Sequence, residues 1–381
     1  MEFELAPAQR QIRQTVSEFV DREVIPVAAE IDATGEFPAA LIEEMGELGL
    51  LGMPFPEEYG GAGLSYHAYV SCLAEISRGS GALGTIVGAH TSLAAHLLFQ
   101  HGTTAQKRAY LTSLSQGEDI GAFALSEADA GSDITAMDST VQQDGDGYRL
   151  EGTKMWVSNG TVADTVIVVA KTDPEAGRQG LSSFVVRPEE DDGYCVEGTE
   201  AKLGDRGCPT AALRFDSVYL PAGRCLGEEG DGFYQALHGL NCGRISVAAR
   251  GVGIAQAALD ASVAYAEQRE QFDQPIGAFQ SIRHKLANMD TKLQTAKMLM
   301  HRAADRKIRD EPFVKAAAQA KLHASEVSRE VANQAIQVHG GYGYTTEYPV
   351  ERFYRDAKLN EIYEGTSEIL RNTIADRVID C

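Results

Sequence analysis

Glu364 lies in the segment Ile362–Arg371 (IYEGTSEILR), where one carboxylate stands between apolar residues and a glycine. Thr366 or Ser367 can cap a helix that follows, and a carboxylate just ahead of a helix is normally solvated. An apolar pocket would instead remove water from the carboxylate and raise its pKa toward the range in which a general base works. The segment therefore indicates a proton-abstracting glutamate, with a solvated cap neighbour as the alternative.

Two further segments carry residues that suit a ligand with a ring system and an anionic group. In Phe123–Asp133 (FALSEADAGSD), serines and small residues let backbone amides approach an anionic or carbonyl-rich group closely. The segment Lys154–Gly160 (KMWVSNG) holds the single tryptophan of the chain, Trp156, which can serve as an aromatic platform. An ordinary polar turn and a core tryptophan are the respective alternatives.

A cluster of glycines follows a long helical pattern in Gln337–Gly343 (QVHGGYG). One glycine is enough to end a helix, because only a single residue needs the left-handed conformation. Three glycines within four residues indicate that another group must come near this backbone.

Other nucleotide and metal motifs are missing. The sequence has no GxxxxGK[ST] loop, and Gly251–Gln256 (GVGIAQ) lacks the third glycine of a dinucleotide fingerprint, so its glycines are interpreted as close helix packing. The six cysteines form no CxxC pair and the nine histidines form no HExxH motif. We therefore expect no metal site and no disulfide framework.

The overall charge and hydropathy restrict the partners. A formal net charge of −21 repels nucleic acid, so no nucleic-acid partner is expected. No apolar run approaches the roughly 20 residues that cross a bilayer, and no secretory signal is recognisable at the start. The expected location is the cytoplasm, without a membrane span.

The predicted secondary structure changes twice along the chain. Residues 1–116 are helical by pattern, residues 117–228 show short β-rich runs with a hairpin at Asp144–Gly147, and residues 229–381 are helical again. The β runs recur every 8–12 residues, which favours a β-barrel or sandwich. The segments 231–268, 276–308, 312–339 and 365–379 supply a four-helix bundle. The predicted fold class is α+β in an α–β–α order.

Together, in this order and spacing, these segments resemble the acyl-CoA dehydrogenase family over essentially the whole chain. ALSEADAGSD fits one signature of the family, and Gln337–Asp356 (QVHGGYGYTTEYPVERFYRD) fits the other. IYEGTSEILR makes the match highly specific. The α–β–α layout reached from the pattern agrees with the fold of that family.

The resemblance implies an FAD site and an acyl-CoA site. Matching positions for one side of the flavin are Phe123, Leu125, Ser126, Gly131 and Ser132, and for its other side Trp156, Val157 and Ser158. Matching positions that would reach a neighbouring subunit's FAD are Arg269, Phe272, Gln280, Gln337, Gly340 and Gly341, with Thr366 and Glu368 as further cofactor contacts. Some relatives carry glutamine at the position of Glu368. Substrate contacts correspond to Ser132, Asn241, Arg244, Tyr363 and Gly365.

By the same resemblance, Glu364 is the catalytic base. It takes the α-proton of the acyl thioester while the β-hydride passes to flavin N5, which leaves a trans-2-enoyl-CoA. Some relatives carry the base immediately before the residue that matches Arg244, but this chain has Gly243 there. The departure leaves Glu364 as the sole candidate, as in the short- and medium-chain branch.

The resemblance also implies an electron-transferring flavoprotein as acceptor and a homotetramer built as a dimer of dimers. A short, possibly branched, acyl chain is expected. Two alternatives stay open: an oxidase of the same superfamily that uses oxygen, and a catalytically silent partner that binds flavin or acyl-CoA. Acyl-CoA oxidases are typically longer, and nitroalkane oxidases use aspartate as base.

Overall fold

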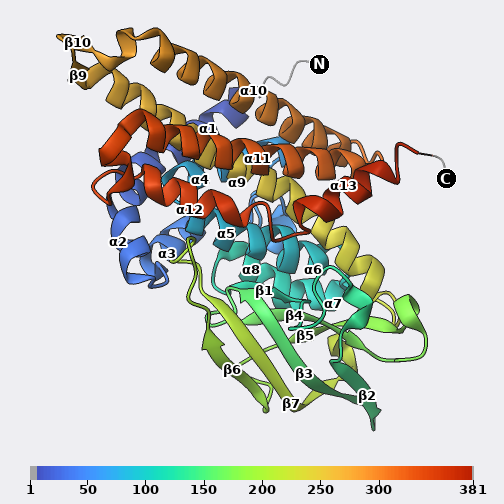
Figure 1. Cartoon of the computed structure of the whole chain (residues 1–381). Coiled ribbons are helices and arrows are strands. Elements are labelled where there is room, and N and C mark those ends of the chain that lie inside the picture. The colour runs from blue at the N-terminus through green and yellow to red at the C-terminus, as the bar shows by residue number, and fades with distance from the viewer. Residues whose placement is uncertain (1–6, 380–381) are drawn as a thin grey trace.

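The computed structural model describes residues 7–379 and confirms the α–β–α order (Figure 1). Helices form the upper layer in that view, and the sheet lies below them. The first and last helical regions, far apart in sequence, pack together in this upper layer. The proposed domain boundaries, after residues 116 and 228, fall between α8 and β1 and between β8 and α9.

From residue 7 onward, the first helical region contains eight α-helices joined by short 3-10 and π segments. These helices are α1 (Pro7–Phe19), α2 (Ala28–Thr34), α3 (Ala39–Glu47), α4 (Tyr66–Gly79), α5 (Gly81–Gly88), α6 (His96–His101), α7 (Thr104–Gln106) and α8 (Thr112–Gln116). In α1, Val16 and Phe19 are buried at helical spacing, so one face of this helix joins the core.

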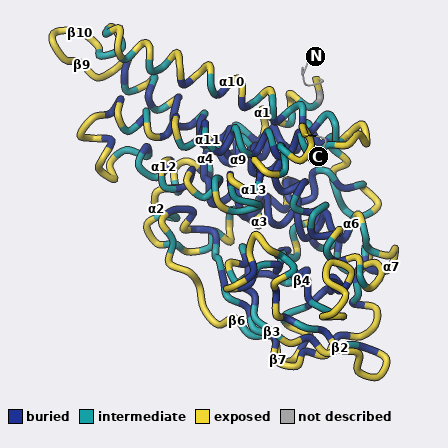
Figure 2. Tube along the Cα trace, turned by 45° about the vertical axis from the view of Figure 1, so that its right-hand side comes forward, coloured by how far each residue is buried: buried dark blue, intermediate teal, exposed yellow. Residues whose placement is uncertain are grey.

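A continuous helical stretch, Gly81–His101, runs from α5 through a π segment (Ala89–Ala95) into α6. By length and composition it could cross a membrane, although no such run was expected from the sequence. Its most apolar window is 94% buried inside the protein, as expected of a core helix. Figure 2 shows the same contrast between a buried interior and exposed outer turns.

The middle region is one eight-stranded sheet in the order β6-β7-β3-β2-β4-β5-β8, with β1 beside β4. Its strands are β1 (Gly121–Ala124), β2 (Thr140–Asp144), β3 (Gly147–Ser158), β4 (Thr165–Lys171), β5 (Leu181–Val186), β6 (Tyr194–Thr199), β7 (Thr210–Pro221) and β8 (Cys225–Leu226). The predicted hairpin is confirmed, because Asp144 pairs with Gly147 where β2 turns into β3.

Strand β4 joins the sheet to the helices. Its side chains alternate between two cores, because successive residues of a strand face opposite sides. Val166 and Val168 belong to the core of the sheet, whereas Ile167 packs with residues of α6 and α8. Burial on both faces explains why this strand is an unbroken apolar run.

The last helical region holds α9 (Gly232–Gln268), α10 (Gln280–Ile308), α11 (Val314–His339), α12 (Val350–Leu359) and α13 (Ser367–Ala375). A short hairpin, β9 (Glu270–Gln271) and β10 (Gln274–Pro275), joins α9 to α10. The four predicted helical segments are present. Helix α12 was not predicted as a separate element, because the residues at its start belong to the signature segment Gln337–Asp356.

Two glycines of α9 allow close helix packing, as predicted. A Cβ atom on Gly253 would stand 2.2 Å from the carbonyl oxygen of Ala74 in α4. A Cβ atom on Gly251 would stand 2.9 Å from the carbonyl oxygen of Ala324 in α11. Helix α9 is therefore held between α4 and α11, and it is the central helix of the region.

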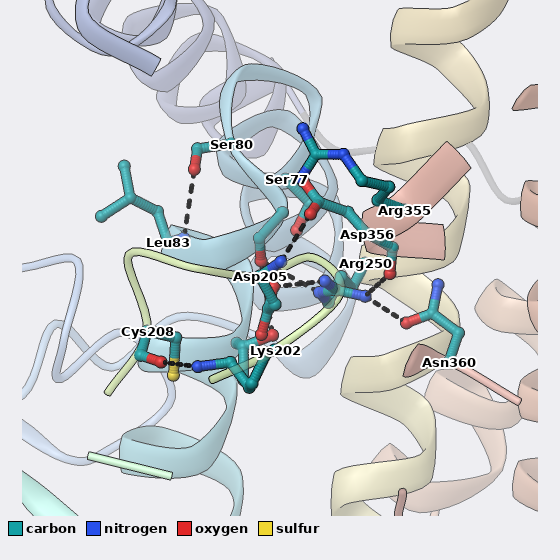
Figure 3. Close-up of polar contacts among 12 residues, drawn as sticks. Ser77, Ser80, Leu83, Lys202, Asp205, Cys208, Arg250, Arg355, Asp356 and Asn360 are labelled. Carbon is teal, nitrogen blue, oxygen red and sulfur yellow. Dashed lines mark hydrogen bonds and ion pairs between the residues drawn. The ribbon is translucent and has the colours of Figure 1, made fainter. Parts of the chain in front are cut away.

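Arg250 is a buried charge at the centre of this packing, with only 1% of its surface exposed (Figure 3). Its guanidinium contacts Asp205 at 2.5 Å and donates to the carbonyl oxygens of Gly81 and Asp356 at 2.9 and 3.2 Å. It also donates to Asn360 Oδ1 at 2.5 Å. One side chain of α9 thus connects the start of α5, the loop after β6 and the end of α12.

Replacement of Arg250 by methionine should destabilise the fold strongly. The variant leaves the carboxylate of Asp205 buried without its cation, and breaking a buried pair from one side costs about 3–5 kcal/mol. We expect a loss of that order in the free energy of unfolding, measured by denaturant titration. Arg214→Met is the matched control, because Arg214 pairs with Glu197 and Asp216 at the surface. Equal losses in both variants would contradict the interpretation.

Candidate active site

The backbone at Glu364 is strained and held from two sides. Glu364 has φ +57° and Gly365 has φ +93°, in the left-handed region that few non-glycine residues adopt. Arg244 of α9 donates through Nε to the carbonyl oxygen of Glu364 at 3.1 Å. Lys321 of α11 donates through Nζ to the carbonyl oxygen of Gly365 at 2.7 Å. Two cations therefore fix the peptide groups on which the side chain of Glu364 depends.

The carboxylate of Glu364 points at α9, where Gly243 leaves room for it. A Cβ atom on Gly243 would lie 2.5 Å from Glu364 Oε2. Glu364 is half-buried as a residue, but its Oε2 is shielded from solvent and has no hydrogen-bond partner within residues 7–379. A buried oxygen without a partner is costly, and such atoms are typical of sites where a ligand completes the contact.

Burial raises the pKa of Glu364 to about 7, and the charges of Arg244 and Lys321 oppose this rise. Burial also lowers the pKa of Lys321 to about 7, although the charge of Glu364 opposes it. A carboxyl group with such a pKa can take up and release a proton near neutral pH. The predicted desolvation of Glu364 is thus present in the structure.

The remaining predicted substrate contacts lie around this carboxylate, with one exception. Asn241 accepts a hydrogen bond from Arg244 at 2.7 Å, and both residues are buried on α9. Gly365 lies against the guanidinium of Arg244, since a Cβ on it would be 3.3 Å from Nη2. Tyr363 precedes Glu364, and its ring lies 6.0 Å from the guanidinium carbon of Arg250. Ser132 is the exception, because it is exposed on the loop after β1.

The two segments predicted to face a flavin are joined by a buried ion pair that sequence reasoning missed. Lys154 of β3 donates to Glu127 at 2.6 Å and to the carbonyl oxygen of Leu125 at 3.2 Å. The backbone N–H of Met155 donates to the carbonyl oxygen of Ser126 at 2.8 Å. These contacts hold the loop after β1 against β3 and fix their relative position.

Trp156 points outward at a bulge of β3. The pairing of β3 with β7 shifts between Lys154 and Val157, and Trp156 has φ +57° with 52% of its surface exposed. Val157 is buried and Ser158 half-buried, while Phe123, Leu125 and Ser126 of the neighbouring segment are buried or half-buried. An exposed indole is a surface that a planar ligand can cover, and the backbone at Gly131 is also open.

The other predicted cofactor residues form two groups. Thr366 caps α13, because its side chain accepts from the N–H of Ile369 at 3.3 Å, and Glu368 is exposed in the first turn. The second group lies at the end of the bundle that carries hairpin β9–β10, away from α13 (Figure 1). It consists of Arg269, Phe272, Gln280, Gln337, Gly340 and Gly341, all of which are exposed. Within one chain, this group is not brought together with Glu364.

The fold and the site together define a three-part α–β–α protein. Its desolvated glutamate, Glu364, lies between α9 and α13, the first and last helices of the C-terminal bundle. Three family models cover nearly all of the chain: the acyl-CoA dehydrogenase N-terminal domain over residues 6–118, the middle domain over 122–218 and the C-terminal domain over 230–379. The chain belongs to the acyl-CoA dehydrogenase family.

Named relatives match over their full lengths. The short-chain specific acyl-CoA dehydrogenase of Clostridium acetobutylicum is 42% identical, with 99% of this chain and 100% of the relative covered. The structure of butyryl-CoA dehydrogenase from Megasphaera elsdenii superposes with a TM-score of 0.97 at 38% identity, covering 99% of this chain and 100% of that one. A chain from a structure of the electron transferring flavoprotein of Acidaminococcus fermentans gives 0.98 at 39% identity and covers both chains fully.

Replacement of Gly243 by alanine should displace the carboxylate of Glu364. The added methyl group would stand 2.5 Å from Oε2, so the side chain must leave its position. A crystal structure of the variant tests this expectation. Gly239→Ala is the matched control one turn earlier on α9, where the atom nearest to the methyl group belongs to the side chain of Leu97, at 3.2 Å. An unmoved carboxylate in Gly243→Ala would refute the steric argument.

Proposed function

We propose that this protein oxidises a short acyl-CoA thioester to the trans-2-enoyl-CoA with FAD as cofactor and Glu364 as base. The observation that carries the proposal is the desolvated carboxylate of Glu364, whose Oε2 has no hydrogen-bond partner within residues 7–379. Its pKa of about 7 suits a group that must accept a proton and release it again.

The residues present fit FAD, the cofactor of the family. Where a Cβ would point at Gly131, Gly340 and Gly341, no atom lies within 4 Å, so the backbone there is open to a ligand. In our proposal Phe123, Leu125, Ser126, Ser132, Trp156, Val157 and Ser158 hold the ring system with Gly131, and Thr366 and Glu368 add contacts. The exposed group at the β9–β10 end would serve the FAD of a neighbouring subunit. When bound, FAD supplies the acceptor for the hydride.

Glu364 performs the proton transfer in this mechanism. The α C–H bond of the thioester breaks, its electron pair stays on carbon, and the proton moves to the Glu364 carboxylate. The carbonyl oxygen gains negative charge as this happens, so a donor aimed at it lowers the barrier. The backbone N–H of Glu364 is suited to that role, because it donates to no acceptor within residues 7–379.

Arg244 and Lys321 act as positioning residues. Arg244 holds the carbonyl oxygen of Glu364 and Lys321 holds that of Gly365, so the strained turn presents both the N–H and the carboxylate to the substrate. Because the two cations face these carbonyl oxygens, they are not available to neutralise the carboxylate by direct hydrogen bonds. The base therefore keeps the raised pKa that its burial produces.

Chain length, acceptor and assembly are parts of the same proposal. The short-chain dehydrogenase of Clostridium acetobutylicum and the butyryl-CoA dehydrogenase support a short acyl chain. The similarity to a chain in the Acidaminococcus flavoprotein structure supports an electron-transferring flavoprotein as acceptor. A homotetramer, built as a dimer of dimers, would place the exposed β9–β10 residues against a neighbour.

The variant Glu364→Gln should keep FAD and lose nearly all flavin reduction. Glutamine keeps the shape but cannot accept the proton, and removal of a general base typically costs at least 10²–10⁴-fold. Anaerobic titration of the flavin absorbance with saturated acyl-CoAs of increasing length measures both this loss and the preferred chain.

Glu361→Gln is the matched control for that titration. Glu361 lies on the same segment, but its carboxylate binds Arg329 and Lys358, so reduction should persist. Near-normal reduction by Glu364→Gln would refute the assigned base. Wild-type protein that binds FAD but is not bleached by any acyl-CoA would favour the silent partner, and rapid reoxidation by oxygen in steady turnover would favour the oxidase.

The rate of flavin reduction should fall as the pH drops through about 7. Glu364 acts as a base only when deprotonated, and its pKa is raised to about 7. Removal of the Lys321 charge by Lys321→Met should raise this pKa further. The acid limb of the pH–rate profile, where the rate falls, should then move to higher pH by roughly one unit. Stopped-flow reduction rates across pH measure the shift. Lys315→Met, on the same helix but bonded to the carbonyl oxygen of Arg377, should leave the limb in place. A shift to lower pH in Lys321→Met would contradict the electrostatic account.

A further inference from the structure

A compact cluster of histidine and cysteine side chains lies one residue from the proposed active site. His238 and Cys242 stand one turn apart on α9, and His96 begins α6 opposite them. One ligand atom from each of the three residues can be chosen so that all lie within 4.8 Å of one another. The cluster arises from the packing of α6 against α9, so sequence motifs gave no sign of it. The spacing of His238 and Cys242, four residues apart on one helix face, was the only local signal.

The three side chains are withdrawn from water. Cys242 is fully buried, His96 is 7% exposed and His238 is half-buried. No carboxylate within residues 7–379 forms an ion pair with His96 or His238, so nothing favours the charged imidazolium there. Neutral imidazoles and a cysteine sulfur are the ligands that Zn²⁺ and Co²⁺ prefer, usually in a tetrahedral arrangement.

A second residue fixes the ring of His238. Nδ1 of His238 lies 3.4 Å from Nε2 of His101, which ends α6. Metal-binding histidines commonly use one ring nitrogen for such an outer contact, and that contact sets the orientation of the other nitrogen. With Nδ1 engaged by His101, Nε2 of His238 is the nitrogen left for an ion.

A positive charge already occupies the neighbourhood of the cluster. Nζ of Lys307 lies 3.5 Å from Nε2 of His96. The same ammonium lies over the rings of Tyr66 and Phe313, at 5.0 and 5.4 Å from their centroids. Lys307 has no carboxylate partner within 4.0 Å in the part of the chain that the structure describes. The surroundings therefore accept a cation, and Lys307 is the group that an incoming ion has to displace.

We propose that His96, His238 and Cys242 form a binding site for one Zn²⁺-class ion, with Lys307 as its built-in competitor. In a tetrahedral site the ligand atoms stand roughly 3.5 Å apart, so these three need to approach by about 1 Å once the ammonium leaves. The Cys242 thiol loses its proton to solvent as the metal–sulfur bond forms, and water takes the fourth position. The proposal rests on this geometry and not on the proposed catalytic function.

Titration of the FAD-containing protein with Co²⁺ tests the proposal. Tetrahedral Co²⁺ bound to a thiolate has visible d–d bands at longer wavelength than oxidised flavin absorbs, and a charge-transfer band from sulfur. We expect these bands to saturate at one Co²⁺ per chain and to disappear when Zn²⁺ is added. In Cys242→Ser, a substitution of nearly equal size, the charge-transfer band should vanish and the affinity should fall at least tenfold. Absence of the bands in both the wild-type protein and Lys307→Met would overturn the site.

Two further variants separate the site from adventitious binding. Lys307→Met removes the competing charge and should tighten Co²⁺ binding at least tenfold, whereas weaker binding would overturn its assignment as competitor. Cys225→Ser changes a cysteine that is half-buried and lies outside the cluster, and it should leave the bands unchanged. If Cys225→Ser abolished the bands while Cys242→Ser kept them, the ion would be bound elsewhere and the proposal would fail. Melting temperatures of all variants, measured without metal, identify any that are misfolded.

Discussion

Arg250 carries its charge in the interior, where water cannot solvate it, and the groups that replace the water come from three separate parts of the chain. The guanidinium is bound by Asp205, Gly81 and Asn360, and each of these groups loses its contact with water in doing so. Removing ions from water is expensive, so the arrangement is tolerable only when all partners are in place at once. This requirement couples the helices to the loop after β6.

Asn360 connects the buried Arg250 cluster to the active site. Its side chain binds Arg250 and Ser328, and its carbonyl oxygen accepts from Ser325 of α11 at 2.8 Å. The chain then has only three residues before Glu364, and Tyr363 lies near the guanidinium. The strained turn is thus anchored on its N-terminal side by Arg250 and on its C-terminal side by the Thr366 cap of α13. Local strain persists because the surrounding structure overdetermines it.

Periodicity was enough to predict the large elements. The long helices of the bundle, the Asp144–Gly147 hairpin and the Thr366 cap all follow from patterns within a few neighbouring residues. Glu364 could be selected because an acidic residue in an apolar, glycine-containing segment is unusual. The resemblance to the family then supplied the remaining positions, most of which stay predictions.

Side chains whose role depends on distant partners could not be predicted. Lys321 and Arg250 lie in alanine-rich helical patterns, where a basic residue normally faces water. Only the fold shows that Lys321 is buried against Gly365 and Arg250 against Asp205. Lys154 is similar, since its partner Glu127 is 27 residues away on another segment. A pattern of 3.6 residues identifies which face of a helix is buried, but not which charge on that face has a partner.

The contact between Gly243 and Glu364 has a consequence for how the family can diversify. A Cβ atom at position 243 would lie 2.5 Å from Glu364 Oε2. A side chain there would therefore overlap with the carboxylate of Glu364. Any side chain placed at position 243 has to displace the carboxylate of Glu364 before it can occupy this volume. The steric conflict at this position therefore favours one location of the base at a time.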